Sequence, residues 1–101
     1  VDIIITAMVL HHVKDLKTLI DGFISILSEK GKIIIFDLDE EDGSFHEKDF
    51  DGHYGIKREF LKRLFLEKGI EKIKFFDVLS EKKIRNGVEK EYSIFLCFVQ
   101  K

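Results

Sequence analysis

This chain of 101 residues contains one cysteine, no proline and almost no excess of charge of either sign. The single cysteine, Cys97, excludes a disulfide bond within the chain and is typical of a reducing compartment such as the cytoplasm. Lysine and arginine number 17 and aspartate and glutamate 19, so the net charge of −2 offers no basic surface for a nucleic acid or an anionic membrane. Proline is absent, and its absence points to no particular function.

Long hydrophobic runs are also missing. The longest ones, near residues 3–10 and 94–99, are far too short to span a bilayer, and no basic segment with a cleavage site suggests export. The chain instead contains a mixture of 45% hydrophobic and 36% charged residues, which is typical of a folded globular protein. We therefore expect one domain over residues 1–101, located in the cytoplasm.

Two isoleucine-rich runs predict the first strands. Residues 2–6 and 32–38 are almost continuously apolar, as in strands buried on both faces. Between them, Asp15 is suited to cap a helix that stops by Gly31, and its apolar residues repeat at helical spacing: Leu16, Ile20, Phe23 and Leu27. A strand, a helix and a strand with short connections predict a right-handed crossover between parallel strands.

The second half of the chain predicts another helix and a hairpin. The helix begins near Ile56 and ends at Gly69, and the two strands span residues 73–79 and 92–99. Asn86-Gly87 between these strands is a strong signal for a two-residue hairpin turn. The last strand is apolar on both faces, so we expect it in the centre of the sheet, antiparallel to the strand before it.

The hairpin turn also fixes an expected register. A two-residue loop pairs Arg85 with Val88, and counting outward sets Glu81 opposite Tyr92 and Phe75 opposite Phe98. This register places apolar side chains on both faces of the strands, which predicts helices on both sides of the sheet.

Three segments resemble the C-terminal half of the class I S-adenosylmethionine-dependent methyltransferases. "DIIITAMVLHHVKD" (2–15) is similar to the family's fourth strand and the turn after it, and "LIDGFISILSEKGKIIIFDLD" (19–39) to the next helix and fifth strand. "GHYGIKREFLKRLFLEKGIEKI" (52–73) is similar to the family's H-x-G segment and the apolar pattern behind it. The resemblance implies a partial Rossmann-like α/β fold with helices packed on a mixed sheet of about four strands. In the family's numbering the strand order is 4-5-7-6, with the last strand antiparallel.

The family's cofactor-binding half has no counterpart in these residues. No turn of G-x-G-x-x-G spacing follows a strand, and no acid is placed to bind the cofactor's ribose. We therefore expect residues 1–101 to correspond to the second half of the fold and to bind S-adenosylmethionine weakly or not at all on their own. The resemblance still implies that Thr6, Ala7 and Met8, just past the first strand, flank the methionine part of this cofactor.

Two adjacent histidines follow these positions. The resemblance sets them near the substrate, with His11 as a binding residue and His12 as a catalytic residue. A second interpretation is that both only cap and pack the junction between strand and helix. A third is a metal site that adds His46, His53 and the acidic loop. Because adjacent histidines lack the i, i+4 spacing of a helical metal pair, we expect no bound metal.

The polar stretch from residue 39 to 55 is the other candidate site. Residues 37–51 include eight acids and one lysine. Phe45 and Tyr54 are candidates for the wall of a substrate site, and Asp37, Asp39 and His53 are candidates for a general base there. The alternative is a solvated acidic loop that buried aromatic residues hold in place.

These observations favour an S-adenosylmethionine-dependent methyltransferase of small-molecule type, present as an incomplete chain. The alternative is a non-catalytic remnant or interaction module that pairs with itself or with a partner supplying the missing half. The first strand is expected at a sheet edge without the proline or lysine that protects such edges. We therefore expect a dimer or a complementing chain.

Overall fold

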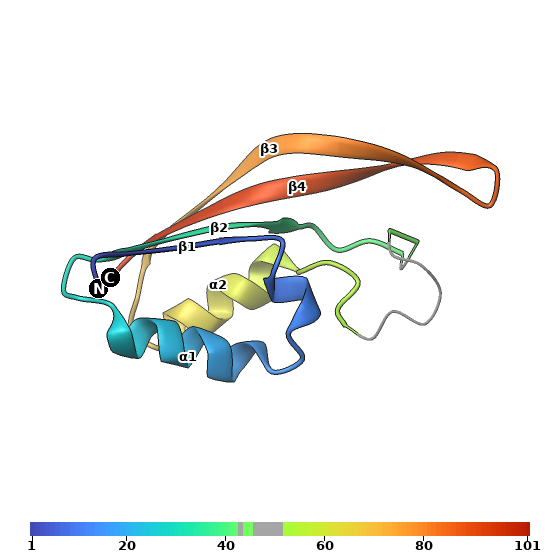
Figure 1. The fold of residues 1–101 in the computed structure, drawn as a ribbon. Helices are drawn as coiled ribbons and strands as arrows, with labels where there is room; N and C mark the ends of the chain where they lie inside the picture. The colour runs from blue at the N-terminus through green and yellow to red at the C-terminus, as the bar shows by residue number, and fades with distance from the viewer. Residues whose placement is uncertain (43, 46–51) are drawn as a thin grey trace.

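Four strands form one twisted sheet, and both α-helices lie on the same face of it (Figure 1). The computed structural model describes residues 1–42, 44–45 and 52–101. Its elements, in chain order, are β1 (Ile3–Ala7), the 3-10 turn η1 (Leu10–His12), α1 (Leu16–Ile26), β2 (Lys32–Leu38), α2 (Arg58–Leu66), β3 (Lys72–Arg85) and β4 (Val88–Gln100). The predicted α/β class and the mixed four-stranded sheet are confirmed.

The order of the strands in the sheet is β1-β2-β4-β3 when they are numbered along the chain. The order expected from the resemblance, 4-5-7-6, uses the family's numbers instead. β1 and β2 are parallel, and β4 lies between β2 and β3 and runs antiparallel to both. The central position of the last strand is therefore confirmed, while the assignment of the sheet to a Rossmann-like fold stays a proposal.

The two helices use their apolar faces to build the core against one side of the sheet. Asp15 caps α1 as predicted, because its side chain accepts hydrogen bonds from the backbone N–H of Thr18 at 3.1 Å and from its hydroxyl at 2.7 Å. Such a cap stabilises a helix by about 1 kcal/mol. The side chains that fill the space between helices and sheet are fully or almost fully buried, among them Leu16, Ile20, Ile33, Ile35, Leu61, Phe65, Phe95 and Val99.

The hairpin of β3 and β4 extends well beyond the rest of the sheet (Figure 1). Asn86 and Gly87 form its turn with φ values of 54° and 77°, and the predicted pair of Arg85 and Val88 is present. A β-bulge between Asp77 and Leu79 then shifts the ladder by one residue.

Because of the bulge, the predicted pairing of Phe75 with Phe98 is wrong, and Phe75 lies opposite Cys97. Because of the one-residue shift, Phe75 lies on the opposite face of the sheet from the predicted one. There its ring meets Phe95 edge to face, with centroids 5.7 Å apart.

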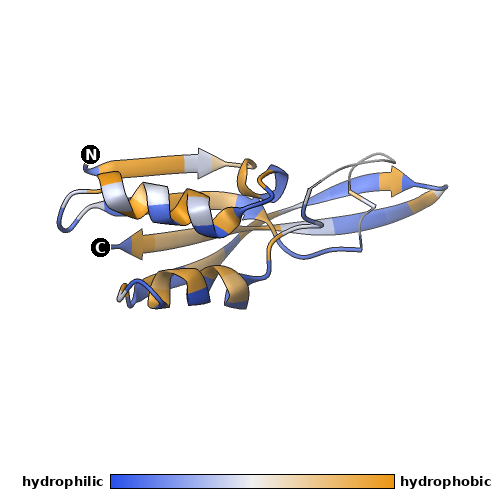
Figure 2. Ribbon diagram, turned by 90° about the horizontal axis from the view of Figure 1, so that it is seen from below, coloured by the Kyte–Doolittle hydropathy of each residue, from blue (hydrophilic) through white to orange (hydrophobic). Residues whose placement is uncertain are grey.

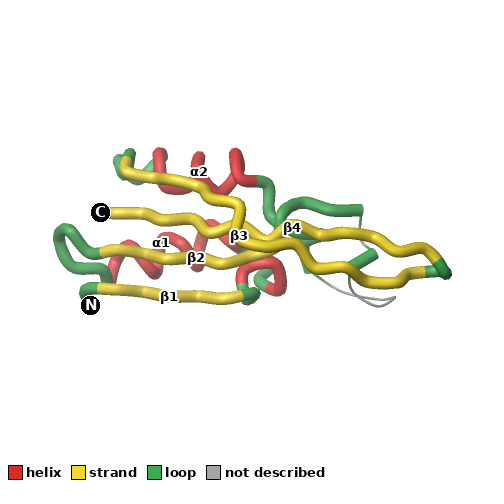
Figure 3. The backbone as a smooth tube through the Cα atoms, turned by 90° about the horizontal axis from the view of Figure 1, so that it is seen from above, coloured by secondary structure: helices red, strands yellow, loops and turns green. Residues whose placement is uncertain are grey.

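The prediction that helices cover both faces of the sheet is wrong. Seen from below, α1 and α2 lie in front of the sheet, and seen from above no helix lies over the strands (Figures 2 and 3). Ile3, Ile5 and Phe76 point to the open side and expose 56%, 65% and 51% of their surface. β1 is consequently partly buried on one face and exposed on the other. Within the described ranges, no helix has both the length and the hydrophobicity needed to cross a membrane.

Candidate functional site

The carboxyl ends of β1 and β2 meet at one edge of the sheet and carry the residues singled out from the sequence. Met8 continues the ladder by one hydrogen bond, from its backbone N–H to the carbonyl of Phe36 at 2.8 Å. Its positive φ of 59° then turns the chain sharply away from the strand and into η1. Ligands of open α/β sheets bind outside the carboxyl ends of parallel strands, so this edge is the first place to look for a site.

A buried pair of side chains, His11 and Asp37, holds the two strand ends together. His11 exposes 1% of its surface and Asp37 none. One carboxyl oxygen of Asp37 accepts hydrogen bonds from Nδ1 of His11 at 2.6 Å and from the backbone N–H of Leu38 at 2.8 Å. The other oxygen accepts from the backbone N–H of Leu10 at 2.8 Å. Three donors thus converge on one carboxyl group, and the turn after β1 is fixed to β2.

His53 is brought to the same place from a distant part of the sequence. Its backbone N–H donates to the carbonyl of His11 at 2.7 Å, and its ring Nε2 lies 3.2 Å from the carbonyl oxygen of Lys14. A carbonyl only accepts, so this contact places the proton of a neutral His53 on Nε2 and leaves Nδ1 as an acceptor. His12 is exposed, and its ring lies 4.2 Å from that of His11, centroid to centroid.

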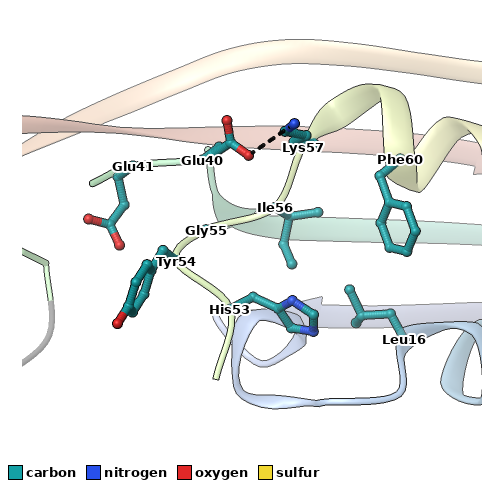
Figure 4. A pocket seen from close by; sticks show the side chains of 9 residues that line it. All are labelled: Leu16, Glu40, Glu41, His53, Tyr54, Gly55, Ile56, Lys57 and Phe60. Carbon is teal, nitrogen blue, oxygen red and sulfur yellow. Dashed lines mark ion pairs between the residues drawn. The ribbon is translucent and has the colours of Figure 1, made fainter. Parts of the chain in front are cut away.

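Next to His53 a cavity of about 420 Å³ opens on the helix side of the sheet (Figure 4). It lies between the start of α1 and the start of α2, and Tyr54 stands at its rim with 52% of its surface exposed. Lys57 and Glu40 form an exposed ion pair of 3.6 Å at the opposite rim. The cavity mixes an apolar floor with acidic, basic and imidazole groups, and its lining consists of Leu16, Glu40, Glu41, His53, Tyr54, Gly55, Ile56, Lys57 and Phe60.

A glycine shapes the back of this cavity. Gly55 has a φ of +76°, and a Cβ atom there would lie 2.0 Å from the carbonyl oxygen of Asp39. Only glycine allows the segment to approach β2 so closely and to form the bridge between Ile56 and Asp39. The absence of one side chain therefore sets the position of His53 and Tyr54.

The residues expected to flank a cofactor lie at the end of β1 and do not line this cavity. Ala7 is exposed, and Met8 packs against a small cluster of Leu38, Phe45 and Tyr92. The hydroxyl oxygen of Thr6 is inaccessible to solvent and has no hydrogen-bond partner among the residues that the structure describes. Native proteins rarely leave a buried hydroxyl without a partner.

Phe45 lies in that small cluster and not in the cavity wall. It is buried, meets Tyr92 edge to face at 5.1 Å and carries the ammonium group of Lys83 3.6 Å from its ring centre. Nearby, a hydrogen bond from Lys90 lowers the pKa of Asp42. These contacts agree with the alternative interpretation of the loop, in which aromatic residues hold an acidic segment in place.

Asp37, a candidate base from the sequence, has a structural part instead, because it is buried and accepts three hydrogen bonds. Arg58 also has a structural part in the site, and no signal in the sequence indicates it. It binds both carboxyl oxygens of Asp39 at 2.8 and 2.9 Å and Asp77 at 2.6 Å, and these hydrogen bonds raise the pKa of the guanidinium group. It thereby fastens the start of α2 to β2 and β3.

The alternative of a metal site draws no support from the geometry. Among residues 1–42, 44–45 and 52–101, no three side chains of His, Cys, Asp or Glu come together as ligands would. His46, which the metal interpretation includes, lies outside the described residues. Comparison with protein-family models and with curated proteins yields no match to this chain.

Proposed function

We propose that the chain forms the strand-end part of a small-molecule methyltransferase site that uses S-adenosylmethionine. The observation that carries the proposal is the buried His11–Asp37 pair, which fixes the turn after β1 to the end of β2. Around it lie an open strand end with Thr6, Ala7 and Met8, and a cavity of about 420 Å³ that contains His53 and Tyr54. The proposal includes a Rossmann-like fold and a cytoplasmic location. The free thiol of Cys97 supports the location.

The residues present fit one end of the cofactor. The turn at Met8 and the exposed Ala7 suit the methionine part, whose amino and carboxyl groups seek hydrogen bonds, and Thr6 precedes them at the end of the strand. Residues 1–101 contain no glycine-rich turn of G-x-G-x-x-G spacing to approach the remaining part. When bound, the cofactor supplies a methyl group on a positively charged sulfur.

The residues of this chain would act on the methyl acceptor. Methyl transfer depends mainly on holding the attacking atom in line with the methyl group, and the cavity beside His53 offers the space for that. Nδ1 of His53, an acceptor in the neutral ring, takes the proton that the attacking O–H or N–H group loses. Tyr54 and the exposed His12 contact the acceptor at the mouth of the site. His11 and Asp37 are positioning residues, since both are buried.

Calorimetric titration with S-adenosylmethionine tests the proposal. We expect weak binding with a dissociation constant in the millimolar range, because only one end of the cofactor finds partners. Replacing Ala7 with Phe would fill the strand end and abolish the heat of binding, whereas His12→Ala would leave the dissociation constant within about twofold.

Two results would contradict the proposal. The first is the absence of heat at millimolar cofactor. The second is micromolar affinity that survives Ala7→Phe, since the cofactor would then bind elsewhere.

The open face of the sheet favours a second candidate function, that of an interaction module. Large apolar side chains such as Ile5 and Phe76 lie more than half exposed there. Such surfaces commonly mark contacts between proteins. The two candidates share Ala7, which is exposed on the open face at the end of β1.

A further inference from the structure

The open face of the sheet is an apolar surface with a ridge on one side and a hollow on the other. The ridge is formed by Ile3 and Ile5 of β1, which expose 56% and 65% of their surface. The hollow lies between β3 and β4, has a volume of about 610 Å³, and is lined by Phe76, Leu96 and Phe98 with the stems of lysines at its rim. Partly buried Ile34 and Phe36 of β2 connect the two.

Ridge and hollow occupy the same level along the strands. The ladder sets Ile5 beside Ile34, Ile34 beside Phe98, and Phe98 beside Lys74. One rung below, Ile3 is joined in the same way through Lys32 and Gln100 to Lys72. A line drawn across the sheet at either level thus begins on the ridge and ends at the hollow.

We propose that this open face binds the open face of a second copy of the chain in a two-fold symmetric dimer. A two-fold axis parallel to the strands, between β2 and β4, turns β1 of one copy over β3 of the other without changing the level of any rung. Ile3 and Ile5 of each copy then enter the hollow of its partner. The contact is isologous, and the strands of the two sheets run nearly aligned, as in β-sandwiches.

Three lysines lie on the face, Lys32 at the start of β2 and Lys72 and Lys74 on β3. The two-fold axis sets Lys72 and Lys74 over β1 of the other copy, three strand spacings of about 4.8 Å from the same two residues of that copy. Lys32 and Lys72 lie on the end rung of the sheet, where their ammonium groups reach water while their stems pack on the face.

The area of the face is sufficient for a stable dimer. Ile3, Ile5 and Phe76 leave on the order of 100 Å² each in water, and the partly buried side chains bring the apolar area to about 500 Å². The lysine stems and Gln100 at the rim bring the area closer to the about 800 Å² that each partner of a specific interface usually contributes.

Pairing of two β1 edges is the competing mode of self-association. β1 hydrogen-bonds to β2 alone, so its outer edge can receive another strand. However, those edge groups already bond to water, and exchanging water for another strand gains little. Edge pairing would also leave the apolar face of both copies exposed. The face is therefore the surface that association covers.

Light scattering coupled to size exclusion tests the dimer on the purified chain. At high micromolar concentration we expect twice the monomer mass of 11.8 kDa. Ile5→Asp on the ridge and Phe76→Asp beside the hollow should each weaken the dimer by about tenfold or more, with circular dichroism showing that the variants stay folded. Ile84→Asp is the matched control, since Ile84 is 71% exposed on the distant hairpin and should leave the dimer unchanged.

Phe76→Asp separates the two modes because Phe76 lies on β3, at the other side of the sheet from the β1 edge. A dimer that survives Phe76→Asp and is lost in Ile5→Asp would mean edge pairing and would overturn the proposal. A folded wild-type monomer at high micromolar concentration would overturn it as well. Since Phe76 is half exposed, its replacement keeps the test valid even if Ile5→Asp fails to fold.

Discussion

Asp37 is the residue on which the geometry of the strand-end site depends most. Its carboxyl group accepts hydrogen bonds from His11, Leu10 and Leu38 in a place without solvent. Asp37→Asn replaces one accepting oxygen with a donating NH₂ group, so at least one buried N–H loses its partner. We expect the free energy of unfolding to fall by about 1–3 kcal/mol. Urea denaturation followed by circular dichroism measures this change.

The exposed Glu29→Gln is a control of the same chemistry and should leave stability unchanged within about 0.5 kcal/mol. Equal stability of the two variants would show that the His11–Asp37 pair does not hold the turn after β1.

Cys97 gives the molecule a dependence on alkaline pH. Burial raises the pKa of its thiol from 9.0 to about 12, with a smaller opposing effect of Arg58. Between these values the folded chain keeps the proton that the unfolded chain releases. The contribution of this group to stability is therefore fully present below pH 9 and is lost as the pH rises toward 12, by at most about 1.4 kcal/mol per pH unit.

Denaturation of the wild type and of Cys97→Val across this pH range measures the effect. Because lysine and tyrosine titrate in both proteins, the difference between them isolates the thiol, and the wild type should lose more stability. A thiol reagent at pH 8 should modify only the unfolded chain. Rapid modification of the folded wild type would contradict the burial of Cys97.

At the scale of the elements, the approach of the 52–57 segment to β2 depends on Gly55. The Cβ atom of an alanine there would clash with the carbonyl oxygen of Asp39, and the positive φ would be strained as well. We therefore expect Gly55→Ala to destabilise the chain by about 3 kcal/mol or more. Gly69 also has a positive φ, of +79°, but nothing lies within 4 Å of its added Cβ. Gly69→Ala should therefore cost only about 1 kcal/mol. Thermal denaturation of both variants compares the two, and equal losses would mean that the close contact at Gly55 is not formed.

Elements defined by local signals could be predicted from the sequence. The cap at Asp15, the strand 32–38 and the turn at Asn86 and Gly87 each follow from a few neighbouring residues, and each is present. The bulge beside Val78 depends on how β3 packs over its whole length, and no nearby glycine or proline signals it.

The cover of the sheet could not be predicted either, for a different reason. Apolar residues such as Ile3 and Phe76 indicate that burial of this face would be favourable, but they do not indicate which segment covers it. For the site, the sequence indicated the histidines and the strand end. It did not reveal that His11 would meet Asp37, 26 residues away, or that His53 would bind the carbonyl of Lys14.

At the scale of the whole molecule, the sheet has three distinct surfaces. The helix-covered face holds the core, the carboxyl ends of β1 and β2 hold the candidate site, and the open face holds the proposed dimer contact (Figures 1 and 3). Since the site lies at the strand ends, a second copy on the open face leaves the cavity of Figure 4 accessible. The register, however, sets Ala7 on the same level as Phe76, so in the dimer Phe76 of one copy lies over Ala7 of the other. We therefore expect the dissociated variant Phe76→Asp to bind S-adenosylmethionine at least as tightly as the wild type. Titration of both proteins checks the expectation, and a fall in affinity of more than about twofold would contradict it.

The central claim is that the methyl donor binds at the carboxyl end of β1. A titration of the ¹⁵N-labelled chain with S-adenosylmethionine, followed by amide chemical shifts, tests it most directly. The largest shifts should occur at Thr6, Ala7 and Met8, smaller ones at His53, and all should saturate together in the millimolar range. Unchanged amides at the end of β1 in millimolar cofactor, or shifts confined to the open face around Phe76 and Phe98, would contradict the claim.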